Sequence, residues 1–171
     1  PAAPAKKMMA SPLLAHLGLS GMFIPFTGEP LVNGLLPDVT LPVVVAHEKA
    51  HQRGITNEAE ANLAAFLVCS RAEEPYLRYA AYLSATVRLL SALSVPAPEE
   101  ARAGWRWLGE GPRRDLTAIR EFWTRYEGRL SDATEKVNDR YLRSMRVPGG
   151  AESYGRVAGL LVALHRRGEL V

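Results

Sequence analysis

The chain has 171 residues, of which 47% are apolar and 23% charged, and its formal net charge is +3. This composition is typical of one compact domain that buries a core without disulfides, and with Cys69 as the only cysteine an internal disulfide is excluded. Cationic residues are spread along the chain with no basic patch between aromatics, so we expect no nucleic-acid partner. No apolar run reaches the roughly 18 residues of a membrane span.

The N-terminal region divides into two predicted parts. We expect residues 1–19 to be a linker or a cut end of the chain, and residues 20–171 to form a single domain. Residues 21–32 alternate apolar residues with proline, glycine and threonine, a pattern that suits a short β-hairpin or edge strand and equally a plain loop.

The next predicted element is a helix that begins near Thr40, a good N-cap residue, with Pro42 in its first turn. It carries His47 and His51. A helix repeats about every 3.6 residues, so histidines four positions apart project from one face and can bind one metal ion. Glu48 follows the first histidine, where it can take a proton from water at that ion. The alternative is a solvated helix face, but the preceding valines favour a buried helix.

A short reversal and a second helix are predicted after the histidines. Gly54 is a natural helix terminator, and Asn57 with Glu60 forms a capping box that opens the second helix. Either Glu58 or Glu60 could supply a third metal ligand. Glu60 already has a capping role, whereas Glu58 lies one turn before Asn62, so we predict Glu58 as the ligand and Asn62 as a partner that orients a ligand. Acids in a first turn also suit the helix dipole without any metal.

The rest of the chain is predicted to be helical. Apolar residues at helical spacing follow Pro75, and further helices are expected over residues 98–108, 112–126, 131–145 and 151–166. The predicted fold class is therefore mainly α, with a short β-hairpin or edge strand before the histidine helix.

Several of these segments resemble a known family. Residues 20–69, and also 136–142 and 153–156, are similar to the bacterial membrane-anchored zincin-like proteins catalogued as domain of unknown function 3810. The resemblance runs from about residue 20 to the C-terminus. It implies a helical zincin-like, peptidase-like domain on the extracytoplasmic face of a bacterial cytoplasmic membrane, in a full-length protein anchored by N-terminal transmembrane helices.

A second similarity concerns the third ligand. The Glu-x-x-Ala-Asn segment resembles the Glu-x-x-Ala-Asp segment of membrane zinc peptidases that process prenylated proteins, in which the first glutamate binds the metal. This resemblance favours Glu58, although Asn62 stands where those peptidases have an aspartate.

A peptidase also needs a donor for the oxyanion formed during amide hydrolysis. Tyr154 and Arg156 are the predicted donors, because both side chains can hydrogen-bond a negative oxygen. Asn138 and Tyr141 could bind a substrate backbone in the same way. The alternatives are that Asn138 ties helices together and that Tyr154 caps a helix or packs.

We therefore expect a zinc-dependent metallopeptidase that acts on a peptide or protein substrate. His47, His51 and Glu58 would hold Zn²⁺ with one position open, and Glu48 would be the general base. An edge strand before the helix would hold the substrate backbone by strand addition. Two alternatives stay open, a non-catalytic zinc-stabilised binding or sensory domain and a zinc amidase with a non-peptide substrate. The sequence predicts no oligomeric state.

Overall fold

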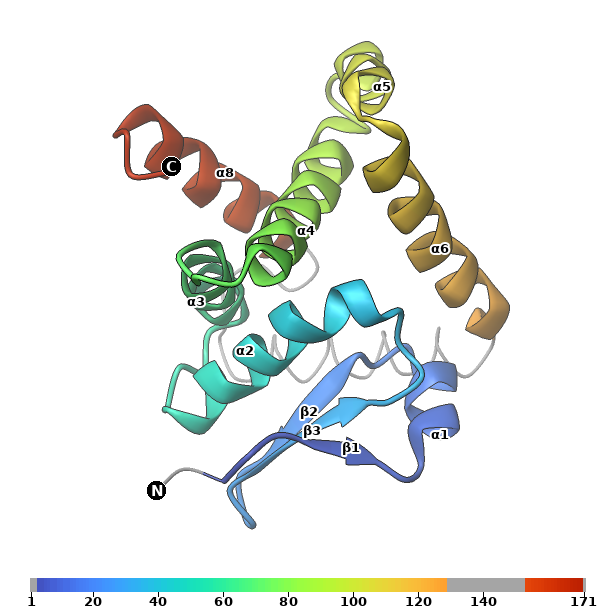
Figure 1. Ribbon diagram of the computed structural model, residues 1–171, viewed down its shortest axis with the longest axis vertical. Coiled ribbons are helices and arrows are strands. Elements are labelled where there is room, and N and C mark those ends of the chain that lie inside the picture. Colours follow the sequence, from blue (N-terminus) through green and yellow to red (C-terminus); the bar gives the residue numbers. More distant parts are fainter. Residues whose placement is uncertain (1–2, 129–152, 171) are drawn as a thin grey trace.

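The computed structural model describes residues 3–128 and 153–170, and these residues form a small sheet and a helical layer (Figure 1). The sheet has three strands, β1 (Lys6–Met8), β2 (Gly21–Ile24) and β3 (Glu29–Asn33), in the order β1-β3-β2. β2 and β3 form an antiparallel hairpin in which Gly21 pairs with Val32, and β1 pairs with β3 in parallel. The short helix α1 (Ser11–His16) connects β1 to the hairpin.

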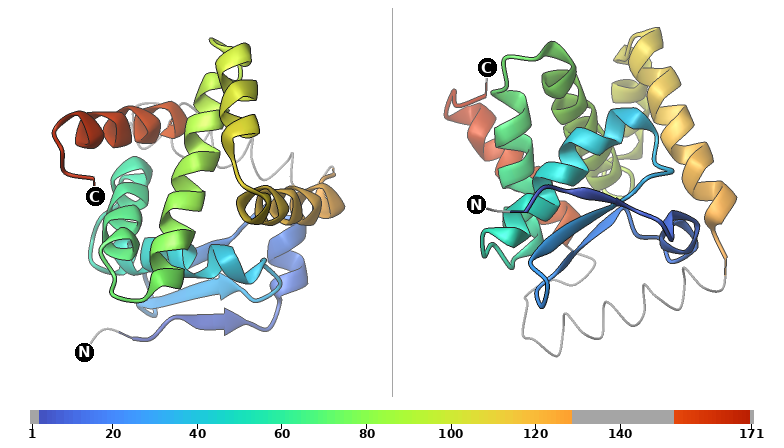
Figure 2. Two further views of the ribbon diagram at one scale, coloured as in Figure 1. Left: turned by 45° about the horizontal axis from the view of Figure 1, so that its top comes forward. Right: turned by 60° about the horizontal axis from the view of Figure 1, so that its bottom comes forward.

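The helix α2 (Leu41–Gln52) lies between the sheet and the two helices that follow it in the chain (Figures 1 and 2). A single 3-10 turn, Asp38–Thr40, leads into it, and Pro42 occupies the first turn, where a missing N–H costs nothing. Its contacts are with β2 and β3 on one side and with α3 (Glu58–Ser70) and α4 (Pro75–Leu93) on the other. This helix is therefore packed on both sides.

The remaining described helices are α5 (Pro98–Trp107), α6 (Glu110–Tyr126) and α8 (Ser153–Arg166). The largest core joins α2, α3, α4 and α8. Alanines make up much of it, which lets the helix backbones approach closely, and its buried residues are Val43, Ala59, Ala65, Phe66, Cys69, Ala80, Ala81, Ala85, Val157 and Leu161. A second core, of Ala15, Leu36 and Phe122, joins α1 and α6 beside the start of α2. Together the two cores fix α2 in the middle of the fold.

The predicted fold class is confirmed at the level of a mainly helical domain with a small sheet before the histidine helix. The predicted hairpin at residues 21–32 and the helices expected over residues 98–108, 112–126 and 151–166 are present. The helix expected over residues 131–145 lies outside the described residues. None of the described helices has the length and hydropathy needed to cross a membrane.

The prediction that residues 1–19 are a linker is wrong from Lys6 onward. This segment supplies β1, which adds to the sheet, and α1, in which Leu14 is 2% exposed and Ala15 is fully buried. The physical reason is that three residues of β1 acquire a strand conformation through pairing with β3, more than twenty residues further along the chain. Local sequence pattern does not reveal such a pairing.

Candidate metal centre

The reversal between α2 and α3 is built from local capping interactions. Gly54 adopts a φ of +90°, its N–H donates to the carbonyl of His51 (2.9 Å), and the N–H of Ile55 donates to the carbonyl of Ala50 (3.1 Å). This pair of bonds is a Schellman motif, which ends a helix and favours glycine. The side-chain oxygen of Asn57 then accepts from the N–H groups of the second and third residues of α3, at 3.0 and 3.1 Å. The predicted terminator and N-cap are both confirmed.

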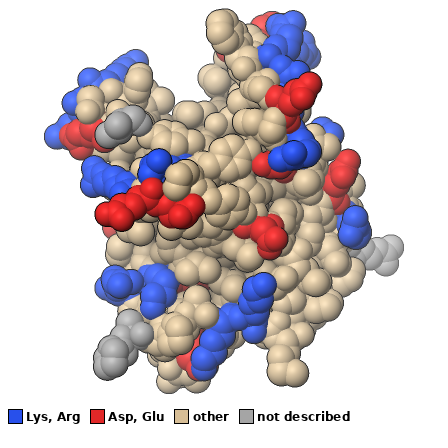
Figure 3. All heavy atoms as spheres, viewed as in Figure 1, with Lys and Arg blue, Asp and Glu red and all other residues tan. Residues whose placement is uncertain are grey.

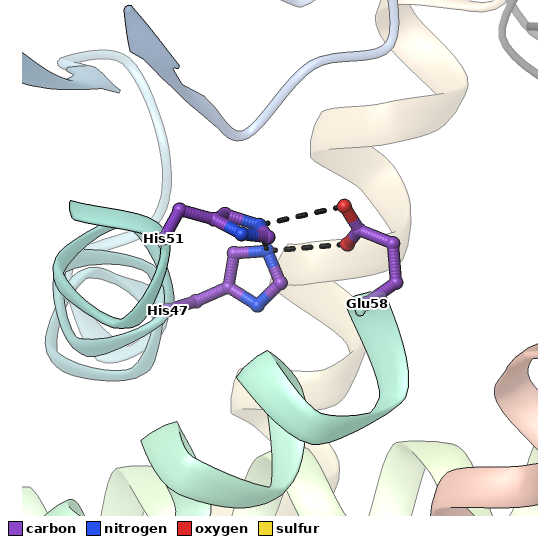
Figure 4. A group of neighbouring side chains, drawn as sticks. All are labelled: His47, His51 and Glu58. Carbon is purple, nitrogen blue, oxygen red and sulfur yellow. Dashed lines mark hydrogen bonds and ion pairs between the residues drawn. The ribbon is translucent and has the colours of Figure 1, made fainter. Parts of the chain in front are cut away.

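This reversal brings the three predicted ligands together (Figure 4). The Nε2 atoms of His47 and His51 are 3.0 Å apart. The carboxylate of Glu58 faces them from α3, with Oε2 3.3 Å from Nε2 of His47 and Oε1 3.4 Å from Nε2 of His51. One ligand atom from each residue lies within 4.8 Å of the others, so the group could hold a metal ion.

The outer nitrogens of the two imidazoles differ in their surroundings. Nδ1 of His51 is 2.7 Å from the carbonyl oxygen of Ile55. A carbonyl oxygen only accepts, so Nδ1 carries a proton. In the neutral ring Nε2 then holds the lone pair that a metal needs, and in the protonated ring the N–H of Nε2 donates to Glu58. Nδ1 of His47 is buried and has no hydrogen-bond partner among the described residues. His51 is thus held for ligation by the same reversal that ends α2.

His47, His51 and Glu58 form a triad in which the two histidines favour the ionised form of Glu58, and Glu58 favours the ionised form of His51. Burial alone would raise the pKa of Glu58, but hydrogen bonds from His47 and His51, together with their charge, outweigh burial and lower it to about 2. The hydrogen bond with Glu58 raises the pKa of His51 above its usual value, against the opposing effect of burial. The carboxylate of Glu58 is therefore ionised at neutral pH, as a metal ligand must be.

Glu48 lies beside the triad on the side that faces the sheet. The residue is 4% exposed, and none of the described residues donates a hydrogen bond to its carboxyl group. Burial raises its pKa to about 7, although the charges of His47 and His51 act in the opposite direction. Glu48 is thus a buried carboxyl group that is electrostatically coupled to the two histidines without belonging to the ligand group.

The predicted choice between the two acids of α3 agrees with the geometry. Glu58 belongs to the group of potential ligands, whereas Glu60 does not and is exposed to solvent. The capping box is half formed, because Asn57 caps α3 but no hydrogen bond of the Glu60 side chain is found among the described residues. The side chain of Glu60 is exposed to solvent, whereas that of Glu58 faces the two histidines.

The predicted role of Asn62 is not supported. Its amide oxygen accepts from Nη2 of Arg88 at 2.7 Å, which ties α3 to α4. Within the described residues no hydrogen bond joins Asn62 to His47, His51 or Glu58. Orientation of a histidine comes instead from a backbone carbonyl, that of Ile55. The physical reason is that the guanidinium of Arg88 offers a charged donor, which forms a stronger hydrogen bond than a neutral imidazole does.

The two predicted oxyanion donors both lie on α8. Arg156 is exposed, and in the described part of the chain no hydrogen bond or ion pair links it to the triad. The side chain of Tyr154, and all of Asn138 and Tyr141, lie outside the described residues. The role of these residues therefore stays a prediction.

Sequence reasoning missed Gly21, which packs against Glu48. A methyl group on Gly21 would lie 2.7 Å from Oε1 of Glu48. A glycine inside a predicted strand is a general signal of close backbone approach, and it could have directed attention to this position. No local signal identifies Glu48 as the residue that it meets.

The surface around these elements carries both signs of charge. On the face shown in Figure 3, separate groups of acidic and basic side chains lie on a surface that is mostly uncharged. The described side chains on this face form no broad area of one sign.

The fold and the site define a mainly helical domain with a candidate metal centre of two histidines and one glutamate on adjacent helices. The chain belongs to the family described as "Protein of unknown function (DUF3810)", whose model matches residues 1–162. The match includes the segment that forms β1 and α1. No curated protein and no solved structure matches the chain.

Proposed function

We propose that this protein is a zinc-dependent hydrolase with a zincin-like fold, and that it cleaves peptide bonds. The observation that carries the proposal is the position of Glu48, a buried carboxyl group next to a three-residue ligand group that it does not join. A purely structural ion needs a closed shell of protein ligands and no such neighbour.

The ligand set supports zinc. Imidazole nitrogens and carboxylate oxygens bind zinc at about 2.0–2.2 Å, so two such ligands of a tetrahedral ion lie about 3.3–3.6 Å apart. The two distances from Glu58 to the histidines, 3.3 and 3.4 Å, fall in this range, and the distance between the two Nε2 atoms, 3.0 Å, lies slightly below it. Three ligands also leave room for a fourth, as in catalytic zinc sites.

Each residue of the site then has a distinct task. His47, His51 and Glu58 would hold the ion, and the Ile55 carbonyl keeps the His51 ring in the binding tautomer. Zinc in such a site supplies Lewis-acid polarisation and acidifies water to a pKa of about 7. Glu48 accepts the proton of the attacking water and returns it to the leaving amine. A pKa raised to about 7 suits a group that must take and release a proton near neutral pH.

The substrate class and the location of the protein are part of the proposal. β2 is an edge strand beside Glu48, which supports an extended peptide as substrate. Tyr154 and Arg156 are the proposed oxyanion donors. The family resemblance supports an extracytoplasmic domain in a membrane-anchored protein.

The proposal is tested with the purified protein, a peptide library and a panel of non-peptide amides, each with and without a zinc chelator. We expect peptide hydrolysis that chelation abolishes and zinc restores. Glu48→Gln should keep stoichiometric zinc and the same circular dichroism while turnover falls about 10²–10⁴-fold. Unchanged hydrolysis by that variant would refute the role of Glu48, and cleavage of the non-peptide amides alone would replace the substrate class.

A further inference from the structure

Gly21 begins β2 and lies directly against the side chain of Glu48. A methyl group on Gly21 would be 2.7 Å from Oε1 and 2.9 Å from Cγ of Glu48. Carbon atoms in favourable contact are about 3.5–4.0 Å apart, so no side chain fits between this strand and the carboxyl group. Gly21 does not have a positive φ, so space rather than backbone conformation excludes alanine here.

The strand cannot move away from Glu48 easily. The same methyl group would lie 2.9 Å from the carbonyl oxygen of Leu31 in the central strand β3. The preceding residues are held by Asn33, which is fully buried. Its backbone N–H donates to the carbonyl of Ser20 (2.9 Å), and its Nδ2 donates to the carbonyl of Leu19 (3.3 Å). Because the backbone is fixed on this side, the flexible side chain of Glu48 is the part that would shift.

We propose that Gly21 is a positioning residue for Glu48, and that its missing side chain sets where the carboxyl group of Glu48 lies beside the histidines. No described residue hydrogen-bonds the Glu48 carboxyl group, so its position depends on packing, and Gly21 forms the wall on the sheet side. The steric part of this inference stands without any activity. The catalytic part rests on the proposed function.

The steric part is tested by a double-mutant cycle on metal-free protein. Gly21→Ala should lower the thermal midpoint, and in a Glu48→Ala background, where Cγ and Oε1 are absent, its effect should be smaller by about 2 °C or more. Equal losses in both backgrounds would show that the two residues do not compete for space, and would overturn the proposal.

The catalytic part is tested with the zinc-loaded protein. Gly21→Ala should keep one zinc per chain and a nearly unchanged KM, while kcat falls about 10²-fold because the base is displaced. Gly104→Ala is the matched control. A methyl group on Gly104 would also be too close to a side chain, 2.8 Å from Cδ2 of Leu90, but this contact joins α5 to α4. An equal loss of kcat in both variants would refute positioning.

The two experiments separate the two ideas. If the effects of Gly21→Ala and Glu48→Ala are not additive but the protein hydrolyses no amide, the inferred Gly21–Glu48 contact is supported and the proposed function is refuted. If the two effects are additive but the protein is an active hydrolase, the inferred contact is refuted and the proposed function stands.

Discussion

His51 donates the proton on Nδ1 to the carbonyl oxygen of Ile55, and that carbonyl belongs to the turn that ends the helix of His51 itself. The ring is therefore oriented by the backbone of its own helix terminus. The tautomer of this residue depends on the Schellman turn at Gly54, and a backbone carbonyl rather than a side chain holds it.

The first prediction concerns Gly54, whose φ is +90° and where an added Cβ would have open space around it. Gly54→Ala should lower the free energy of unfolding by about 1–2 kcal/mol, the cost of a side chain in the left-handed region. Because the turn moves, the Ile55 carbonyl no longer orients His51, and zinc affinity should also fall. Loss of a group that orients a metal ligand typically costs at least about 10-fold in affinity. Chemical denaturation and calorimetric zinc titration measure the two effects.

Gly159→Ala serves as the control for that change. Gly159 lies in α8, is exposed, and also has free space around it, but its φ is not positive. This variant should be neutral or slightly more stable, because alanine favours helix over glycine. A similar loss of zinc affinity in both variants would contradict the role given to the turn.

The second prediction separates the two acids of α3. Glu58→Gln removes a charged ligand. It should therefore weaken zinc binding by more than about 10–100-fold, the usual effect of removing a residue that only orients a ligand. Glu60→Gln removes the same charge two residues later from an exposed side chain and should leave zinc affinity unchanged. Titration of both metal-free proteins with Zn²⁺ measures the difference, and equal affinities would remove Glu58 from the ligand set.

The third prediction concerns pH and the metal-free protein. The pKa of Glu48 is raised from 4.5 to about 7, so its neutral form stabilises the fold below pH 4.5 and this contribution is lost as pH rises through about 7. The raised pKa of His51 acts in the same direction. Glu58, lowered to about 2, contributes above pH 4.5 and loses its contribution as pH falls toward 2. Stability should therefore be highest near about pH 5.

Urea unfolding in the presence of a chelator, from about pH 4 to 8, tests this dependence. Glu48→Gln should remove much of the decline between about pH 5 and 8, up to about 3 kcal/mol. Glu60→Gln should leave the profile unchanged. An identical slope in the wild type and in Glu48→Gln would show that burial of Glu48 does not couple to folding.

The fourth prediction is that Asn57→Ala lowers the free energy of unfolding by about 1 kcal/mol, because two N–H groups of α3 lose their acceptor. Asn57→Asp should retain the cap and most of the stability. Thermal unfolding of both variants checks the effect, and equal losses would show that the cap hydrogen bonds contribute nothing.

The parts of the site that sequence could predict are those that depend on local rules. Helical spacing placed His47 and His51 on one face, and capping chemistry located Gly54 and Asn57. Glu58 was preferred over Glu60 because of the expected capping role of Glu60 and the spacing from Glu58 to Asn62. Glu58 does belong to the ligand group, although Asn62 bonds Arg88 and no cap hydrogen bond of Glu60 is found among the described residues. The mainly helical fold with a preceding hairpin was predictable from the same local rules.

The parts that could not be predicted depend on pairs distant in sequence. β1 adopts its strand conformation only through β3, and the contact between Gly21 and Glu48 arises where the sheet meets α2. Asn62 was assigned to the metal because one helical turn separates it from Glu58, but Arg88 of the next helix is its partner. Each is a tertiary contact between side chains or strands whose partner cannot be identified from local pattern.

The short stretch of chain between the first and last ligand has a consequence for local dynamics. An ion bound to His47, His51 and Glu58 closes only a small loop, so it removes little entropy from the unfolded chain as a whole. Its binding free energy should act mainly on opening of the reversal between α2 and α3. Amide hydrogen exchange should therefore slow in that reversal when the ion binds, while exchange in the sheet changes little.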